Sequence, residues 1–290
     1  FAETVTLPGT TDSNRKGIEN TNKSETTYLS RYYKYEGAAW YSRNIEIPAD
    51  WKEKHIVLFL ERTRPTTVWI DGREVGKCNY LSTPQEFNLT HFLAPGSHKL
   101  TIRVDNGKSI PGQIRSSSHA CTESTQTNWN GIIGRMELQA MNPLFIESIQ
   151  ALSNSSGIGG KKLQLSASAF NTAKKHKARS AEYNLKEGSK EYEFTYQLGD
   201  NAVLWSDLQP ALYQLKAEIN GIDEKTVRFG LRDFKTEETH FTINGAKTFL
   251  RGKHDACVFP LTGHTAMDLE QWRRYFRICK EYGLNHCRFH

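Results

Sequence analysis

The sequence has 290 residues, of which 37 % are hydrophobic and 11 % aromatic, and its formal net charge at pH 7 is +6. This length allows two domains and part of a third, and the aromatic residues are numerous enough to fill large cores. No apolar run approaches the length of about 18 residues that a membrane-spanning helix needs, so no membrane partner is expected. The first residues carry no signal-peptide pattern.

The positive charge is modest, and its densest cluster is the segment 174–179. No aromatic residue interleaves with this cluster and no nucleic-acid motif surrounds it, so it predicts a solvated hairpin tip and no nucleic-acid partner. The cysteine count, five, is odd and includes no CxxC spacing. This argues against a disulfide framework or a zinc site and predicts mostly free thiols. No metal or other cofactor is expected.

Residues 1–142 read as short strands separated by turns. Segment 56–60 is a continuous apolar run, which is typical of a strand buried on both faces, and segment 98–104 alternates between apolar and polar residues. The pair Asp71-Gly72 between two strand segments indicates a type I′ hairpin turn. Short strands at this spacing predict a β-sandwich or jelly roll.

A polar stretch from residue 106 to 128 interrupts this strand pattern. A loop of about 20 residues in a compact domain is usually either functional or disordered. Three tryptophans, Trp40, Trp69 and Trp205, are predicted to be core residues, although exposed aromatic rings can stack on sugars.

Asn142-Pro143 marks a predicted domain boundary. Residues 143–236 again alternate as short strands, with a turn at Asn220-Gly221, and their number fits an immunoglobulin-like sandwich. The Cys-Trp-Cys pattern of antibody domains is absent from the sequence.

From residue 237 the pattern changes to strand, helix, strand. Asp268 is the predicted N-cap of the helix, with Gln271 reaching back to it, and Gly283 is predicted to end it. Such a unit implies a right-handed parallel crossover, and a parallel pair cannot bury both faces alone. Residues 237–290 are therefore expected to open a larger α/β domain that this chain does not complete.

Polar residues gather where these two strands end. In the last strand His286, Arg288 and His290 share one face by the period of two, and the preceding strand ends in His254-Asp255. Polar groups at the carboxyl ends of parallel strands are typical of the active-site wall of a barrel enzyme. A solvated strand edge is the alternative interpretation. The sequence contains no metal-ligand spacing, nucleophile elbow or phosphate-binding loop.

Several short motifs follow one another in a fixed order along the whole chain. They are Leu7-Pro8-Gly9-Thr10-Thr11-Asp12, Ala38-Ala39-Trp40-Tyr41 with Arg43, Val68-Trp69-Ile70-Asp71-Gly72, Leu100 to Asn106, Trp129-Asn130-Gly131-Ile132 with Arg135, Phe229-Gly230-Leu231-Arg232, Phe241-Thr242-Ile243-Asn244-Gly245 and Leu250-Arg251-Gly252. Their order and spacing resemble glycoside hydrolase family 2, which includes β-galactosidases, β-mannosidases and β-glucuronidases.

The resemblance implies a mainly β chain of three parts. These are a jelly-roll sugar-binding-type domain at 1–142, an immunoglobulin-like sandwich at 143–236 and the truncated start of a (β/α)8 barrel at 237–290. It also implies retaining hydrolysis by two glutamates about 5–5.5 Å apart. In the family both glutamates lie on later barrel strands, so this chain alone is expected to be inactive.

The function that the resemblance favours is an exo-acting β-glycosidase, most similar to a β-galactosidase, acting on the terminal sugars of oligo- or polysaccharides. A β-mannosidase or β-glucuronidase of the same family remains open, as does a non-catalytic carbohydrate-binding or adhesion module, because fold does not fix function. A carbohydrate is the expected partner, and a homo-oligomer remains open. The resemblance favours a periplasmic or extracellular location.

Family roles can be transferred to single residues. Arg288 matches an arginine that supports the nucleophile carboxylate, a role suited to a permanently charged guanidinium. His290 falls near a histidine that contacts the sugar, and His254 and Asp255 occupy the loop where the family often carries N-x-H-E. Asn128 is a candidate to reach the site from the jelly roll, with a loop-capping role as the alternative.

Overall fold

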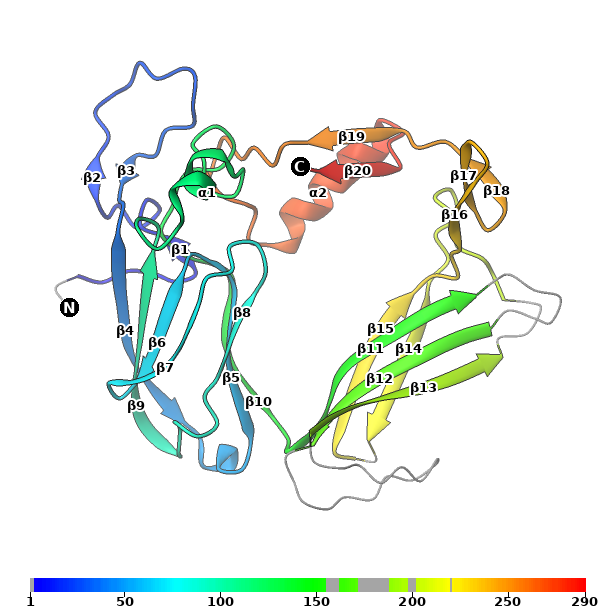
Figure 1. Cartoon of the computed structure of the whole chain (residues 1–290), viewed down its shortest axis with the longest axis horizontal. Coiled ribbons are helices and arrows are strands. Elements are labelled where there is room, and N and C mark those ends of the chain that lie inside the picture. The colour runs from blue at the N-terminus through cyan, green and yellow to red at the C-terminus, as the bar shows by residue number, and fades with distance from the viewer. Residues whose placement is uncertain (1–2, 155–161, 172–187, 198–201, 220) are drawn as a thin grey trace. The chain divides into compact units, whose positions relative to one another are not determined.

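A computed structural model of the chain describes residues 3–154, 162–171, 188–197, 202–219 and 221–290 (Figure 1). The fold is mainly β, as the alternating sequence predicts. The chain forms two compact units, residues 1–140 with 251–290 and residues 141–250. The three-domain division remains a prediction. The basic cluster at 174–179 and Asn220 lie outside the described residues.

The first unit contains two four-stranded sheets. One has the strand order β1 (Gly9–Thr10), β10 (Gly131–Met141), β5 (His55–Thr63), β8 (Gln85–Asn88). The other has the order β4 (Ala38–Ile47), β9 (Gly96–Asp105), β6 (Thr66–Ile70), β7 (Arg73–Cys78). Shorter elements lie in the connections: β2 (Ile18–Glu19), β3 (Tyr33–Lys34), the 3-10 helix η1 (Ala49–Trp51) and α1 (Gly112–Ser117).

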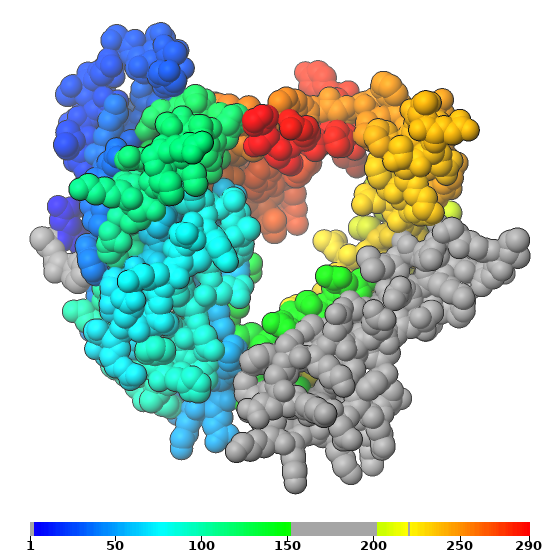
Figure 2. All heavy atoms as spheres, in the orientation of Figure 1, coloured from blue at the N-terminus to red at the C-terminus, as the bar shows by residue number. Residues whose placement is uncertain are grey.

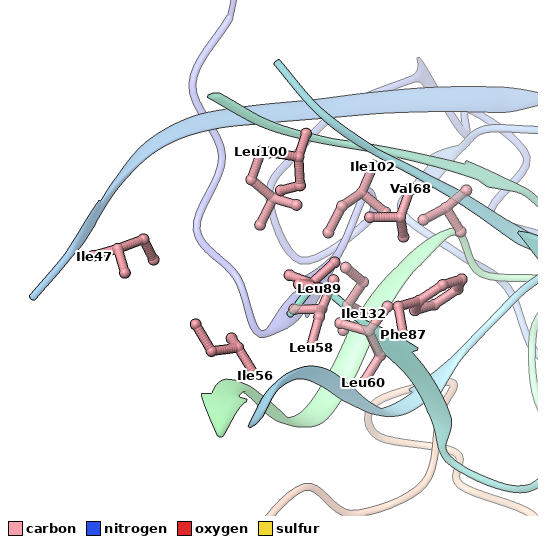
Figure 3. Close-up of a cluster of buried hydrophobic side chains, with 12 residues drawn as sticks. Ile47, Ile56, Leu58, Leu60, Val68, Phe87, Leu89, Leu100, Ile102 and Ile132 are labelled. Atoms are coloured by element: carbon pink, nitrogen blue, oxygen red, sulfur yellow. The ribbon is translucent and has the colours of Figure 1, made fainter. Parts of the chain in front are cut away.

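The hydrophobic core of this unit is formed by buried side chains of β4, β5, β6, β8, β9 and β10 and by Leu89 after β8, with Val75 and Cys78 of β7 packed against it (Figure 3). On β9 the side chains of Leu100, Ile102 and Val104 are buried, as their alternation predicts. The apolar run 56–60 on β5 is buried at every position, which confirms the prediction of a strand covered on both faces. Burial of each large aliphatic side chain contributes about 1.5–3 kcal/mol, so this cluster is the main source of stability in the sandwich.

The tryptophans depart from their predicted positions. Trp40 is 49 % exposed, because its neighbour Tyr41 takes the inward position on β4 and packs against the core. Trp69 and Trp205 are half-buried. The prediction that Trp40 is a core residue was therefore wrong, and the fully buried indole in the described part of the chain is Trp129.

The hairpin joining β6 and β7 has the predicted turn. Asp71 and Gly72 have φ angles of 50° and 79°, the left-handed pair that a type I′ turn requires. The Asp71 carboxylate accepts hydrogen bonds from the Lys99 amide at 2.7 Å and from His98 Nδ1 at 2.6 Å. These bonds lower the pKa of Asp71, and the same carboxylate raises the pKa of His98.

The described residues of the second unit form antiparallel strands. Its sheets are β11 (Leu144–Asn154), β12 (Lys162–Asn171), β13 (Gly188–Gln197); β14 (Tyr213–Ile219), β15 (Asp223–Phe229); and β16 (Phe234–Glu237), β17 (His240–Ile243), β18 (Ala246–Thr248). The Asp223 carboxylate accepts a hydrogen bond from the Ile146 amide at 2.8 Å, which ties β15 to β11.

Residues 251–290 form a parallel strand pair and a helix within the first unit. The elements are β19 (Gly252–Asp255), α2 (Leu269–Glu281) and β20 (His286–Phe289). Asp268 caps the helix by accepting a hydrogen bond from the Gln271 amide at 2.9 Å, and the Gln271 side chain also bonds to it. Gly283 ends the helix with φ 72°. The predicted strand, helix, parallel strand order is thus confirmed.

Candidate functional site

The parallel pairing of β19 and β20 brings three of the predicted site residues together. His254 is in register with Arg288, so their side chains project from the same face of the pair. Arg288 Nη1 lies 3.1 Å from His254 Nε2. The ring of His290, two residues beyond Arg288, stacks on that of His254 with centroids 5.1 Å apart. The predicted polar wall is therefore a contiguous group of side chains.

A fourth member of this group comes from the polar loop of the sandwich. The ring of His119 stacks on His290 with centroids 4.3 Å apart, and its Nδ1 lies 3.2 Å from the Ala256 carbonyl oxygen. Figure 2 shows the atoms of this loop beside those of the C-terminal strand. Sequence reasoning missed His119, because a single histidine in a polar loop gives no periodicity to interpret. We call His119, His254, Arg288 and His290 the histidine-arginine cluster.

None of the four members of the histidine-arginine cluster is acidic. His119 is the main cause that lowers the pKa of His290, and partial desolvation, Arg288 and His254 act in the same direction. An added proton on the His290 ring is disfavoured by the neighbouring rings and by the fixed guanidinium charge of Arg288. Imidazoles beside a permanent cation can bind hydroxyl groups or a carboxylate, but they do not supply an acid and a nucleophile together.

Asp255 lies on the opposite face of the strand pair, toward α2. Its carboxylate accepts hydrogen bonds from Lys253 Nζ at 2.9 Å, from the Cys257 amide at 2.7 Å and from the Tyr275 hydroxyl. Burial alone would raise the pKa of Asp255, but the hydrogen bonds from Tyr275 and Lys253 outweigh it and hold the pKa below its ordinary value. Asp255 therefore fastens the strand to the helix as an ionised group and does not face Arg288.

Asn128 is buried within the loop that carries His119. Its Nδ2 donates to the Asn106 carbonyl at 2.9 Å, and its own carbonyl oxygen accepts bonds from Asn106 Nδ2 at 2.6 Å and Arg31 Nη1 at 2.9 Å. Among the described residues its Oδ1 has no hydrogen-bond partner. These contacts give Asn128 a loop-fastening role.

A fully buried arginine, Arg64, holds the loop that carries His119 and Asn128 by hydrogen bonds to backbone carbonyl oxygens. Arg64 donates to the carbonyl oxygens of Trp129 at 3.0 Å, Ala120 at 2.7 Å and Thr127 at 3.2 Å. Its guanidinium carbon lies 3.9 Å from the centre of the Trp129 ring. Burial lowers the pKa of Arg64 to about 9, which still leaves it charged at neutral pH. We call Arg64, Asn106, Asn128 and Asn130, together with the carbonyls they bind, the Arg64 cluster.

The loop also contacts the segment that follows β19. The Thr127 amide and Oγ1 both donate to the Gly263 carbonyl oxygen, at 2.8 and 3.0 Å. Gly263 has φ 71°, and a Cβ atom there would lie 2.8 Å from Thr127 Cγ2, so only glycine allows this approach. Arg64 therefore positions His119 indirectly, by fixing the loop against the segment after β19.

The described residues show no arrangement typical of metal-dependent chemistry and no disulfide bond. Among them no group of three or more histidine, cysteine, aspartate or glutamate side chains is arranged to hold a metal ion. All five cysteines are free thiols. No described helix is long and apolar enough to cross a membrane.

Two family models match the chain. The model described as "Glycosyl hydrolases family 2, sugar binding domain" matches residues 2–136, and the model described as "Glycosyl hydrolases family 2" matches residues 148–232.

Curated proteins of related sequence include β-glucuronidases and β-galactosidases. A β-glucuronidase from Paenibacillus borealis is 26 % identical over 246 residues, covering 76 % of this chain and 40 % of that protein. A β-galactosidase from Thermoanaerobacter pseudethanolicus is 24 % identical over 284 residues, covering 90 % of this chain and 38 % of that protein. The chain thus spans about two fifths of the length of these relatives.

Solved structures share the fold. A glycosyl hydrolase family 2 member from Bacteroides cellulosilyticus superposes with a TM-score of 0.74 at 20 % identity, over 98 % of this chain and 40 % of that one. At this identity the likeness establishes the fold and nothing finer.

Proposed function

Since the chain belongs to glycosyl hydrolase family 2, we propose that it is the N-terminal part of a retaining exo-β-glycosidase that removes terminal sugars from oligo- or polysaccharides. In this proposal residues 1–142 are the jelly-roll domain, 143–236 the immunoglobulin-like domain and 237–290 the opening of a (β/α)8 barrel. The order of the two matching family models and the parallel β19–α2–β20 unit support this division.

The observation that carries the proposal is the histidine-arginine cluster at the carboxyl ends of two parallel strands. Substrate-contacting residues of barrel enzymes come from this end of the strands. Arg288 is proposed to support the nucleophile carboxylate, and His290 and His254 to contact the sugar. Asp255 and Asn128 are proposed to act as positioning residues, since one fastens β19 to α2 and the other fastens the loop.

The two catalytic glutamates are proposed to come from residues of the whole enzyme outside these 290. Cleavage needs an acid that protonates the leaving oxygen and a carboxylate that attacks the anomeric carbon. The carboxylate of Asp255, next to His254 in the chain, is turned toward α2 and bound to Lys253 and Tyr275. We therefore expect the purified 290-residue chain to leave nitrophenyl β-galactoside, β-mannoside and β-glucuronide intact. Turnover that survives repurification would place the catalytic acids within this chain.

The substrate we propose first is a β-galactoside, and the second candidate is a β-glucuronide. The relatives include proteins named for each activity. A cluster with one fixed cation and three imidazoles also suits the carboxylate of a uronic acid. The ratio of kcat/KM for nitrophenyl β-galactoside and β-glucuronide, measured on the whole enzyme, decides between them.

The test of the site is Arg288→Ala in the whole enzyme. Removing one preorganised electrostatic contact to a catalytic group costs about 2.7–4 kcal/mol, so kcat should fall by about 100- to 1,000-fold while KM changes little. Arg274→Ala on the exposed face of α2 is the matched control and should keep wild-type turnover. Near wild-type kcat in Arg288→Ala would remove the proposed role of this arginine.

A further inference from the structure

Two cysteine side chains meet between α2 and β20, which lie side by side (Figure 1). Cys279 is in the last turn of α2, and Cys287 is the second residue of β20. The Cys279 thiol is hydrogen-bonded to the Cys287 thiol and to the Tyr275 hydroxyl. The same hydroxyl oxygen lies 3.8 Å from Cys287 Sγ. One phenol group therefore contacts both thiols, and the two sulfur atoms are direct neighbours.

The helix and the strand pair bring these groups together by their own geometry. Tyr275 and Cys279 are four residues apart on α2, so their side chains lie on one face of the helix. Cys287 is in register with Lys253 of β19, and both face α2, since Lys253 Nζ lies 3.1 Å from the Tyr275 hydroxyl oxygen. The turn at Gly283 joins the two cysteines across only eight positions of sequence. The thiol contact thus belongs to the helix-strand unit itself.

The surroundings of the two thiols are polar and carry a positive charge. Inert structural cysteines lie in apolar surroundings, whereas reactive ones are partly exposed and close to a cation. The hydrogen bond to Asp255 raises the pKa of Lys253, so its ammonium group stays charged, and this charge acts on both Cys279 and Cys287. A neighbouring cation favours the thiolate form, which is the nucleophile in cysteine oxidation.

The two thiols differ in accessibility. Cys287 is half-buried, whereas Cys279 is 8 % exposed. Burial raises the pKa of the Cys279 thiol, although Lys253 and Tyr275 act in the opposite direction. An oxidant in solution therefore reaches Cys287 first, with Cys279 held beside it as the second reactant.

We propose that Cys279 and Cys287 are a redox-active pair that hydrogen peroxide converts to a disulfide. The Cys287 thiolate attacks one peroxide oxygen, the O–O bond breaks, and the released hydroxide takes up a proton to become water. The Cys279 thiolate then attacks the sulfenic sulfur of Cys287. The S–S bond forms, the S–O bond breaks, and a second water leaves. The two thiols together lose two electrons and two protons to the peroxide.

The disulfide would tie β20 to α2 behind the histidine-arginine cluster. Side chains alternate along a strand, so Cys287 and its neighbour Arg288 project from opposite faces of β20. Oxidation would fasten the strand that carries Arg288 and leave the face of the cluster uncovered. Any effect on catalysis rests on the proposed function, but the reaction of the two thiols does not.

The experiment maps disulfides in the reduced 290-residue chain after exposure to hydrogen peroxide. The chain is unfolded, alkylated with N-ethylmaleimide and digested with trypsin without a reductant. Cleavage after Arg277, Lys280 and Arg288 places the two cysteines on the separate peptides 278–280 and 281–288. We expect these peptides to appear joined, with a mass two hydrogens below their sum, and to separate with dithiothreitol. The thiols that react with N-ethylmaleimide should fall from five to three per chain.

Two variants separate this reaction from general oxidation. In Cys279→Ser the joined peptides should disappear, and dimedone should trap the sulfenic acid on Cys287. Cys121→Ser is the matched control, because it removes another buried thiol, which contacts the Ile114 and Ser118 carbonyl oxygens. Its joined peptides should form at the wild-type rate. Circular dichroism checks that both variants keep the β fold.

The wild-type map alone can overturn the inference. It fails if peroxide leaves the peptides 278–280 and 281–288 separate while it oxidises other cysteines, or if all cysteine pairs become joined in similar amounts. Lys253→Gln gives a further readout, because loss of the cation should slow the joining of the two peptides by about threefold or more. An unchanged rate in this variant would remove the role assigned to Lys253.

Discussion

The hydrophobic core of the sandwich and the Arg64 cluster are both buried in the first unit, yet they are stabilised in opposite ways. The core is a set of aliphatic side chains from two sheets, held by a non-directional effect proportional to buried area (Figure 3). The Arg64 cluster is a charged group and three amides that bind backbone carbonyls at fixed distances. A hydrophobic core tolerates substitution of one side chain by another of similar volume. A buried polar network tolerates almost no substitution that removes a hydrogen-bond partner.

The two regions also differ in what they hold in place. The core joins the two sheets and contains no residue of the candidate site. The Arg64 cluster fixes the loop that carries His119 and that binds the segment after β19 through Thr127 and Gly263. Stability of the sandwich and geometry of the site should therefore respond to different substitutions.

Arg64→Ala should have the largest effect. It leaves three buried carbonyls without donors, and loss of a buried charged hydrogen-bonding group costs about 3–5 kcal/mol of unfolding free energy. Urea denaturation followed by circular dichroism measures this loss, and limited proteolysis should show new cleavage between residues 112 and 128. Arg64→Lys should recover part of the stability only, since an ammonium lacks the planar fork. Unchanged cleavage in the alanine variant would contradict the loop-holding role.

Leu60→Ala should come next, with a loss of about 2–4 kcal/mol from the lost transfer free energy and the cavity. Leu60 is fully buried in the core. Denaturation should show the loss, but the cleavage pattern of the native loop should stay that of the wild type. If this variant exposed the loop as readily as Arg64→Ala, the separation of the two regions would fail. Leu60→Met is the volume-conserving control and should lose less than about 1.5 kcal/mol.

Asn128→Ala should cost about 1 kcal/mol. It removes one side-chain hydrogen bond to the Asn106 carbonyl, and it also removes an Oδ1 atom that has no partner among the described residues. In the whole enzyme KM for nitrophenyl glycosides should change little, since the proposed role is loop fastening. A KM that rises tenfold with unchanged stability would instead place Asn128 on the substrate.

The smallest effect should come from a polar contact outside both regions, the His98–Asp71 pair. The pKa of His98 is raised above its ordinary 6.5 and the pKa of Asp71 is lowered below its ordinary 3.8. The pair therefore makes its full contribution to the free energy of unfolding between the ordinary pKa values of the two groups, 3.8 for Asp71 and 6.5 for His98. That contribution is lost as pH rises through the raised pKa of His98, or falls through the lowered pKa of Asp71.

An exposed pair of this kind contributes about 0.5 kcal/mol. Urea midpoints of the wild type and His98→Ala, measured at several pH values, should differ near pH 5–6 and converge above about pH 8. A difference that grows with rising pH would reverse the assigned sign.

Sequence alone predicted the parts of the fold that local patterns determine. The alternation at Leu100, Ile102 and Val104 gave the inward face of β9, and Asp71-Gly72 gave the turn, because both depend on neighbours in the chain. The Asp268 N-cap and the end of α2 at Gly283 were predictable for the same reason, because both depend on residues close in the sequence. The exposure of Trp40 was missed because its side chain and that of Tyr41 are both aromatic, and pattern alone does not choose which of two adjacent aromatic residues faces inward.

The candidate site was only partly predictable. Period two placed Arg288 and His290 together, and the same rule separates His254 from its neighbour Asp255, which faces α2. His119 and Arg64 carry no such signal, because their contacts join distant segments. An arginine between two strands reads as a surface residue, and only the folded loop shows that three carbonyls surround it.

The bond from Thr127 to Gly263 spans 136 positions of sequence, and the whole unit 141–250 lies between its ends. During synthesis the chain leaves the ribosome from its N-terminus, and domains fold as they emerge. The sandwich can therefore collapse around its core long before the segment after β19 exists. A nascent chain that stops anywhere in the second unit would carry a folded sandwich with an undocked loop, and His119 would meet His290 only when translation of this region is complete.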